Sequence, residues 1–312
     1  MTSAREIESL LQSQLNEWPS AAANYAALTE VKVKDLDFGG MRFRVQFNPA
    51  RAVSSGAKVD AASIKARKCF LCSDNRPECQ QGMEWGGRYV ILVNPFPIFP
   101  RHFTVPCTDH VPQSCRGAVA DMLRLASELE GYTVFYNGPR CGASAPDHFH
   151  FQAGNSDFLP LAANLEKADI SILKNCAEAS LGIVDSLPVK MFVIDAITPE
   201  AGEQMFDLLS ESLPVADGDS EPMLNMLAYS TGRATRLVVV PRKRHRPSFY
   251  GTEGDSCMML SPAAVDMGGV FVTPRLVDFE RFDTDTMSRT LGEICPGTDE
   301  IAEVVVKLQN RN

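Results

Sequence analysis

The sequence predicts an α+β protein with antiparallel sheets and helices packed on one face of them. Short apolar runs, separated by turns rich in Gly and Pro, recur along most of the chain and are typical of antiparallel strands. Longer segments with apolar residues at helical spacing lie between groups of these runs. Groups of strands separated by single helices favour the α+β class over a parallel sheet.

The elements follow from these patterns in chain order. Ile7, Leu11 and Leu15 recur at helical spacing and predict a helix over residues 3–15. Further helices are expected over residues 113–130, 159–179, 199–213 and parts of 284–311. Strands are expected over residues 42–47, 89–93, 102–106, 133–136, 148–153, 190–194, 223–230, 236–240 and 270–273. Residues 214–222, rich in Asp, Gly and Ser, predict an exposed loop.

The most informative run is Asp-His-Phe-His-Phe-Gln at residues 147–152. In a strand, side chains alternate between faces, so both phenylalanines would be buried on one face. His148, His150 and Gln152 would share the other face, about 6–7 Å apart. Such a row can hold a phosphoryl group, with an imidazole as nucleophile and an amide donating to oxygen. The alternative is a surface strand that holds two histidines without a function.

The loop before this run has the composition of an anion site. Residues 137–146 read Asn-Gly-Pro-Arg-Cys-Gly-Ala-Ser-Ala-Pro and follow an apolar strand. Glycine and serine in such a turn let backbone N–H groups face an anion. Alone, the loop would be read as a hairpin connection, and its meaning comes from leading into the histidine strand.

The order Asn-Gly-Pro, Gly-Ala-Ser and His-x-His-x-Gln resembles the transferase branch of the histidine-triad superfamily. That branch includes galactose-1-phosphate uridylyltransferases, dinucleoside tetraphosphate phosphorylases (ATP adenylyltransferases) and GDP-hexose phosphorylases. Other segments fit the resemblance in the same order. Asn-Pro-Ala-Arg at residues 48–51 resembles a phosphate-binding element, and Cys-Phe-Leu-Cys at residues 69–72 resembles a metal-binding pair. Asn-Pro-Phe-Pro at residues 94–97, with His-Phe-Thr-Val at residues 102–105, resembles a nucleotide-binding strand and loop.

The resemblance implies a role for each motif residue. His150 would attack the α-phosphorus and become nucleotidylated, and Gln152 would donate its amide to a phosphoryl oxygen. Because a carboxamide cannot titrate near neutral pH, glutamine favours transfer to phosphate or a sugar phosphate over transfer to water. The residues expected to contact substrate are Arg51, Asn137, Gly142 and Ser144 at phosphate and Asn94 near the ribose.

Cys69 and Cys72 have the spacing of a zinc knuckle, which needs two more ligands. A lone Cys-x-x-Cys pair can also be redox-active or inert, and no thioredoxin-like unit surrounds this one. By resemblance to the uridylyltransferases, His110 fits the third ligand and His148 the fourth, with His102 as the competitor for the third place. The expected cofactor is therefore a structural zinc ion.

The chain also indicates an internal duplication. Val105-Pro106 precedes His110 as Val240-Pro241 precedes His245. The later strand at 270–272 takes the relative place of the catalytic strand but lacks histidine. We therefore predict two histidine-triad-like halves, residues 1–170 with the catalytic motif and residues 171–312 without it.

The densest basic run, Arg-Lys-Arg-His-Arg at residues 242–246, lies in the second half. Its ordinary interpretation is a solvated strand end. Its place in the second half, at the equivalent of a ligand-facing loop, makes His245 and its neighbours candidates for contact with phosphate or sugar phosphate.

The composition narrows the function classes. Hydrophobic residues make up 45% and charged residues 22% of 312 residues, as in globular proteins. The net charge of −9 argues against an extended nucleic-acid surface. No apolar run approaches the ~20 residues that cross a bilayer, and the start lacks the features of a signal peptide. Nine scattered cysteines indicate reduced thiols. We expect a cytoplasmic protein without nucleic-acid or membrane partners, for which a homodimer remains open.

The predicted function is a nucleotidyltransferase or phosphorylase that cleaves a nucleoside diphosphate sugar or a dinucleoside polyphosphate, with phosphate as preferred acceptor. The loop at 142–147 is one residue longer than expected in a uridylyltransferase, and its Gly-Ala-Ser order is closer to the phosphorylases. A hexose-1-phosphate uridylyltransferase is the first alternative. A non-catalytic nucleotide-sugar sensor is the second, and the intact pair of His150 and Gln152 argues against it.

Overall fold

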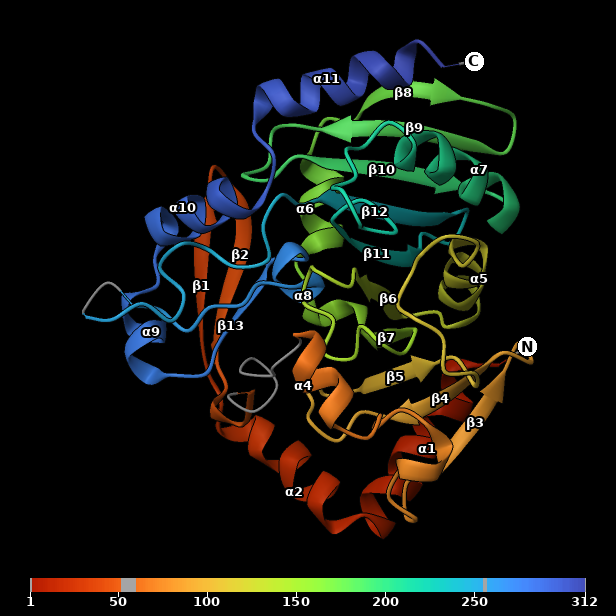
Figure 1. Cartoon of the computed structure of the whole chain (residues 1–312), viewed down its shortest axis with the longest axis vertical. Helices are drawn as coiled ribbons and strands as arrows, with labels where there is room; N and C mark the ends of the chain where they lie inside the picture. Colours follow the sequence, from red (N-terminus) through yellow and green to blue (C-terminus); the bar gives the residue numbers. More distant parts are fainter. Residues whose placement is uncertain (1, 52–59, 255–256, 312) are drawn as a thin grey trace.

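The computed structural model describes residues 2–51, 60–254 and 257–311. Its centre is a ten-stranded antiparallel sheet in the order β3-β4-β5-β7-β6-β11-β12-β10-β9-β8, which Figure 1 shows as a ladder from β8 at the top to β3 at the bottom. The strands are β3 (Gly82–Trp85), β4 (Tyr89–Val93), β5 (His102–Pro106), β6 (Tyr132–Asn137), β7 (His150–Asn155), β8 (Ser171–Asn175), β9 (Ala179–Val184), β10 (Met191–Ala196), β11 (Leu224–Ser230) and β12 (Thr235–Pro241).

The sheet consists of two halves with the same order of elements. Three strands, β3 to β5, precede α5 (Val119–Glu128) and the strands β6 and β7, just as β8 to β10 precede α7 (Pro199–Ser210) and the strands β11 and β12. The halves meet where β6 pairs with β11. The expected fold of two similar antiparallel halves is confirmed. The division at residue 170 stays a prediction, because one continuous sheet joins the halves.

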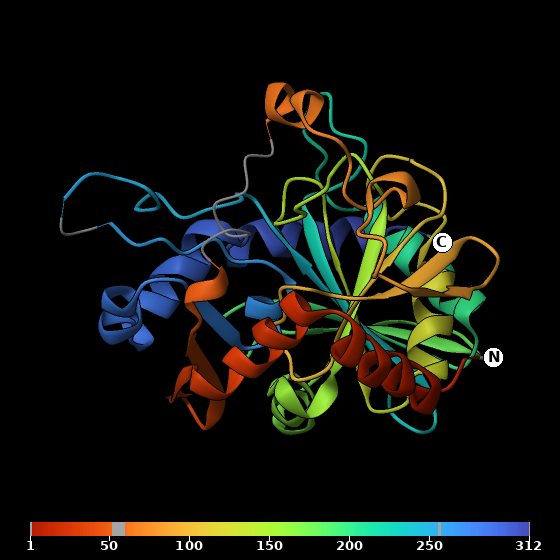
Figure 2. The same cartoon turned by 90° about the horizontal axis from the view of Figure 1, so that it is seen from below.

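Four amphipathic helices cover one face of the sheet: α1 (Ala4–Glu17), α5, α7 and α11 (Thr298–Gln309). Their apolar side chains form one core with alternate residues of the strands, among them Ile7, Leu125, Phe206 and Ile301. The helices form because apolar residues recur at helical spacing, and the sheet buries that stripe. Figure 2 shows α5 and α7 on one side of the large sheet and the layer that covers its other face on the opposite side.

The other face carries a small second sheet. It has three strands, β1 (Lys32–Phe38), β2 (Met41–Phe47) and β13 (Val270–Thr273), and β13 runs parallel to β2. Around it lie α6 (Leu161–Lys167), α8 (Ala264–Met267), α9 (Leu276–Arg281) and α10 (Thr284–Ile294), while α2 (Pro19–Ala26) and α4 (Ala61–Ala66) flank the N-terminal half. The β2–β13 pairing therefore brings residues 270–273 against residues 44–47 of the N-terminal part of the chain.

Some expected elements differ from the structure. The helix expected over residues 159–179 ends at Lys167, because the apolar residues after it form β8 and β9. The helix expected from residue 113 begins at Val119, and β1 and β3 were not expected. The Val-Pro-x-x-x-His echo is also misleading. It relates β5 to β12, whereas β12 occupies the place of β7, and β13 belongs to the other sheet.

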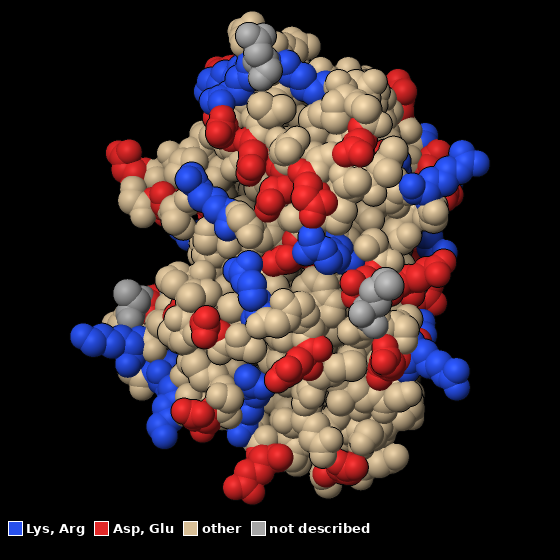
Figure 3. Space-filling model, turned by 90° about the vertical axis from the view of Figure 1, so that its right-hand side faces the viewer, with Lys and Arg blue, Asp and Glu red and all other residues tan. Residues whose placement is uncertain are grey.

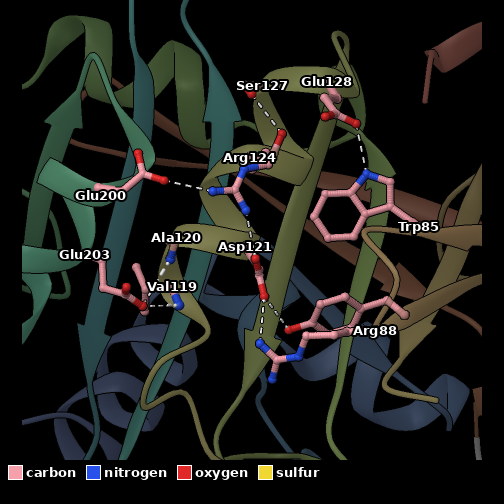
Figure 4. A network of polar contacts seen from close by, with 11 residues as sticks. Trp85, Arg88, Val119, Ala120, Asp121, Arg124, Ser127, Glu128, Glu200 and Glu203 are labelled. Carbon is pink, nitrogen blue, oxygen red and sulfur yellow. Dashed lines mark hydrogen bonds and ion pairs between the residues drawn. The ribbon is translucent and has the colours of Figure 1, made fainter. Parts of the chain in front are cut away.

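A polar network joins α5 to both halves (Figure 4). Asp121 of α5 accepts hydrogen bonds from Arg88 and Tyr89 near β4 and from Arg124. Glu203 of α7 accepts from the first backbone N–H groups of α5, at Val119 and Ala120. Figure 3 shows acidic and basic side chains interspersed over this side of the molecule. Within the described residues, no helix is long and apolar enough to cross a membrane.

Candidate active site

The strand expected to be catalytic begins at the expected nucleophile. β7 starts at His150, and its neighbour β5 pairs with it from Pro106 to His102. The expected alternation holds for the apolar face, because Phe149 and Phe151 are both buried in the core. His148 was expected in the same strand but lies in a bend before it. The two histidines therefore point to different surroundings, and they have different tasks.

The His150 side chain has a defined tautomer. Its Nδ1 lies 2.9 Å from the His148 carbonyl oxygen, so Nδ1 carries the proton that it donates. The lone pair is then on Nε2, and His150 lines the cavity described below. Burial lowers the pKa of His150 to about 4, because a charged imidazole would lose its hydration. The ring is thus neutral at neutral pH and can act as a nucleophile.

The loop expected to bind phosphate is tied to the C-terminal half. The Oδ1 of Asn137 accepts from the backbone N–H of Ala264 at 2.8 Å and from Asn225 Nδ2 at 2.9 Å. Gly142 has φ +99°, and a Cβ there would lie 2.6 Å from the Cβ of Ala263. Only glycine fits this backbone conformation and this close approach without strain. Residues of the C-terminal half therefore hold this loop in place.

A cavity of about 1000 Å³ opens beside His150. This volume is at the upper end of the range for small-molecule sites. The expected residues that line it are Arg51, Asn94, Asn137, Gly142, Ser144, His150 and Gln152. His245 does not line it. Its Nε2 lies 3.4 Å from the Oγ of Ser261, which does.

The C-terminal wall of the cavity was not expected from the sequence. It consists of Ser261, Ala263, Val265, Asp266 and Val272. Asp266 accepts hydrogen bonds from the backbone N–H groups of Ala263 and Val272. Burial nevertheless raises the pKa of Asp266 to about 6. No local motif marks these residues, because they reach the site through tertiary contacts, such as the pairing of β13 with β2 and the hydrogen bond of Ala264 to Asn137.

The four expected metal ligands form one cluster. The Sγ of Cys72 lies 3.2 Å from His110 Nδ1 and 3.5 Å from His148 Nδ1, and the Sγ of Cys69 lies 3.3 Å from His148 Nδ1. The four ligand atoms all lie within 4.8 Å of one another. Tetrahedral zinc with bonds of about 2.0–2.3 Å places its ligand atoms roughly 3.5 Å apart.

The second nitrogen of His148 supports this geometry. Its Nε2 lies 2.8 Å from the Cys107 carbonyl oxygen, to which it donates, so the Nδ1 lone pair faces the cysteines. The donor set therefore fits zinc. His102, the competing third ligand, is absent from the cluster and contacts Gln152 instead.

A family model and a known yeast protein match parts of this chain in sequence. A family model of a domain of unknown function, DUF4922, matches residues 10–155. Diadenosine 5',5'''-P1,P4-tetraphosphate phosphorylase 2 of Saccharomyces cerevisiae is 28% identical over 125 residues, which are 36% of this chain and 38% of the yeast protein. The aligned region thus spans less than half of the yeast protein's length.

Solved structures extend the likeness to nearly the whole chain. Yeast Ap4A phosphorylase Apa2 matches with a TM-score of 0.58 at 17% identity, over 90% of this chain and 97% of that chain. Its complex with AMP matches with a TM-score of 0.55 at 17% identity, over 91% and 96%, and its complex with Ap4A with 0.52 at 16% identity, over 90% and 97%. The chain therefore has the fold of yeast Ap4A phosphorylase, one of the phosphorylases that the sequence motifs resemble.

Proposed function

We propose that the protein is a nucleotidyltransferase of the phosphorylase type. Its donor would be a dinucleoside polyphosphate or a nucleoside diphosphate sugar, and orthophosphate would be its preferred acceptor. The observation that carries this proposal is the neutral His150, whose Nδ1 donates to the His148 carbonyl and whose Nε2 is left as a nucleophile beside a large cavity. The likeness to yeast Ap4A phosphorylase favours the dinucleoside polyphosphate as donor.

The reaction has two steps. First, His150 Nε2 forms a bond to the α-phosphorus while the bond from phosphorus to the bridging oxygen breaks and the remaining nucleotide leaves. The amide of Gln152 and the backbone of the Gly142 loop would stabilise the charge on the phosphoryl oxygens. Second, an oxygen of orthophosphate attacks the same phosphorus, the P–N bond breaks, and a nucleoside diphosphate leaves with neutral His150 regenerated.

We also propose that Cys69, Cys72, His110 and His148 hold a structural zinc ion. A bound ion would link the segment before β3 to the bend before β7, and so fix the carbonyl of His148 that orients His150. The ion lies outside the reacting groups, and no step of the transfer depends on its own chemistry. This site would explain why two histidines separated by one residue have different neighbours.

Covalent labelling tests the function directly. Incubation with Ap4A labelled at the α-phosphates should leave an acid-labile, base-stable label on the protein, and His150→Ala should abolish it. Glu200→Ala, which changes an exposed residue far from the cavity, is the matched control and should label like the wild type. A label retained in His150→Ala would exclude His150 as the nucleophile.

The acceptor is tested with the same donor. Added orthophosphate should accelerate turnover and yield nucleoside diphosphate, with hydrolysis far slower. Acceleration by hexose 1-phosphate but not by phosphate would make the protein a uridylyltransferase. Tight binding of the donor without turnover or label would make it a sensor.

A further inference from the structure

His102 has no part in the metal cluster or the cavity wall, yet it is fully buried beside the catalytic strand. Its ring packs against Phe99 and Phe135, with ring centroids 5.2 and 5.9 Å away, and these two rings also stack on each other. Gly154 of β7 makes this packing fit, because a Cβ there would lie 2.4 Å from Phe99. The backbone of His102 is held too, since its carbonyl accepts from the Tyr25 hydroxyl at 2.8 Å.

The tautomer of His102 follows from a backbone contact. The N–H of Ile98 donates to His102 Nδ1 at 3.2 Å, so Nδ1 carries the lone pair and Nε2 carries the proton. The Nε2–H then donates to Gln152 Oε1 at 3.0 Å. Burial, and the nearby positive charge of Arg51, lower the pKa of His102 to about 3, so the ring stays neutral.

Asn94, in the same loop, provides a second N–H group that faces Gln152 Oε1. The backbone N–H of Phe96 donates to Asn94 Oδ1 at 2.9 Å, which places the Asn94 amide nitrogen on the other side. That nitrogen donates to Thr104 Oγ1 at 3.0 Å and faces Gln152 Oε1 at 3.4 Å. The orientation of both donors thus depends on backbone N–H groups, which cannot flip.

The two donors decide which way the Gln152 amide points. A flipped amide would place Gln152 Nε2 against the N–H groups of His102 and Asn94, three donors with no acceptor among them. In the orientation observed, Oε1 accepts from both, and Gln152 Nε2 has no hydrogen-bond partner among the described residues. Gln152 lines the cavity next to His150, so its N–H groups are available to a ligand there.

We propose that His102 is a positioning residue that directs the Gln152 amide N–H groups into the cavity, toward the phosphoryl group of a bound nucleotide. The inference rests on the proposed function for its effect on turnover, but not for its effect on nucleotide binding. In this proposal the loop from Asn94 to His102 orients the Gln152 amide, a role that neither the strand pattern nor the apolar residues of the loop reveal.

Two substitutions separate the hydrogen bonds of His102 from its packing. His102→Phe keeps a ring packed against Phe99 and Phe135 but removes both hydrogen bonds. His102→Gln can place a carboxamide donor near the position of Nε2. Phosphorolysis of Ap4A should lose about tenfold in kcat in His102→Phe, with a smaller change in KM, and most of the rate should return in His102→Gln. The loss should stay below the 10²–10³-fold that removal of a whole oxyanion donor costs.

A double-mutant cycle tests whether His102 acts through Gln152. In a Gln152→Ala background, His102→Phe should cause no further loss of kcat, because the amide it orients is gone. Equal losses in both backgrounds, or wild-type kcat in His102→Phe, would overturn the proposal. Thermal denaturation of each variant shows whether it is folded, and His102→Gln still tests the inference if His102→Phe is not.

Two measurements need no turnover. ¹⁵N NMR of the His102 ring in the wild-type protein should show the Nε2–H tautomer, and the Nδ1–H tautomer would overturn the inference. Calorimetric titration with AMP should show weaker binding to His102→Phe than to wild type, with recovery in His102→Gln. If the protein binds AMP in this pattern but transfers no nucleotidyl group, the proposed function fails and the inference stands. Equal AMP affinity in all three proteins would contradict it.

Discussion

On the side of His150 that faces β6, the Gln113 side chain makes the hydrogen bonds that a neighbouring strand would otherwise make. Its Oε1 accepts from the His150 N–H at 2.8 Å, and its Nε2 donates to the His150 carbonyl at 3.1 Å and to the Asn137 carbonyl at 3.0 Å. The β6–β7 ladder ends at the pair Phe135 and Gln152. Gln113 thus separates the ends of the two strands, so that the phosphate loop leaves Asn137 and returns at His150 without unpaired backbone groups.

Gln113→Ala should therefore reduce both stability and activity. It leaves the buried N–H of His150 without its acceptor, which costs about 1–3 kcal/mol. The free energy of unfolding in urea measures this loss, and phosphorolysis should fall with it because the nucleophile is less firmly held. Gln81→Ala, at an exposed glutamine, is the control and should change stability by less than about 0.5 kcal/mol. Wild-type stability in Gln113→Ala would refute the bridging role.

Metal analysis should find about one zinc per chain in protein purified without chelator. Cys69→Ser with Cys72→Ser should lose the metal and lower the melting temperature, because metal-binding free energy adds to folding free energy. Cys176→Ser, at an exposed free thiol, should keep both the metal and the melting temperature. If the wild-type protein contains no metal and is no more stable than the double variant, Cys69 and Cys72 are only a pair of thiols and the zinc proposal is wrong.

The buried imidazole of His102 should make stability depend on pH. Its pKa is lowered to about 3 in the folded state and is near 6.5 when unfolded. Between these values the unfolded chain binds more protons, so stability falls as the pH drops from about 7 toward 3. This one group accounts for up to about 3 kcal/mol between pH 7 and pH 4.

The control for this effect is His102→Gln, which keeps a donor but cannot titrate. Its free energy of unfolding should decrease less than that of the wild type over the same pH interval. Asp266, whose pKa is raised to about 6, acts in the opposite direction but is present in both proteins. Parallel pH profiles of the two proteins would show that His102 is not held neutral.

Glu203 and Glu200 of α7 allow a matched comparison at the network of Figure 4. Glu203 accepts from the N–H groups of Val119 and Ala120 at 3.0 and 3.2 Å, and the N-cap residue of α5 offers no side-chain bond of its own. Glu203→Ala should therefore cost about 1 kcal/mol, as the loss of a helix cap does.

The ion pair of Glu200 with Arg124 is exposed, so Glu200→Ala should cost less than about 0.5 kcal/mol. Thermal or urea denaturation of the two variants decides between these values. Equal losses would show that Glu203 does not act as a cap.

Local sequence patterns predicted most of the strands and the motif residues. Alternation identified β7 and its buried phenylalanines, and apolar spacing identified α1 and α7. These predictions succeed because each depends on residues close in sequence. The helix expected through residue 179 was wrong, because residues 171–175 form β8 and short apolar runs of this kind fit either a helix or a strand.

The sequence by itself identified His150, the loop at residues 137–146 and the four Cys and His residues as candidates for a nucleophile, a phosphate loop and metal ligands, because those residue types indicate their chemistry by their order along the chain. Only the tertiary structure decided that Asp266 and Ala263 line the cavity, that Gln113 hydrogen-bonds to the backbone of His150, and that His102 contacts Gln152 rather than the cluster of Cys and His residues. Each of these contacts joins segments far apart in the chain, and it is the pairing of strands and the burial of their side chains that bring them together.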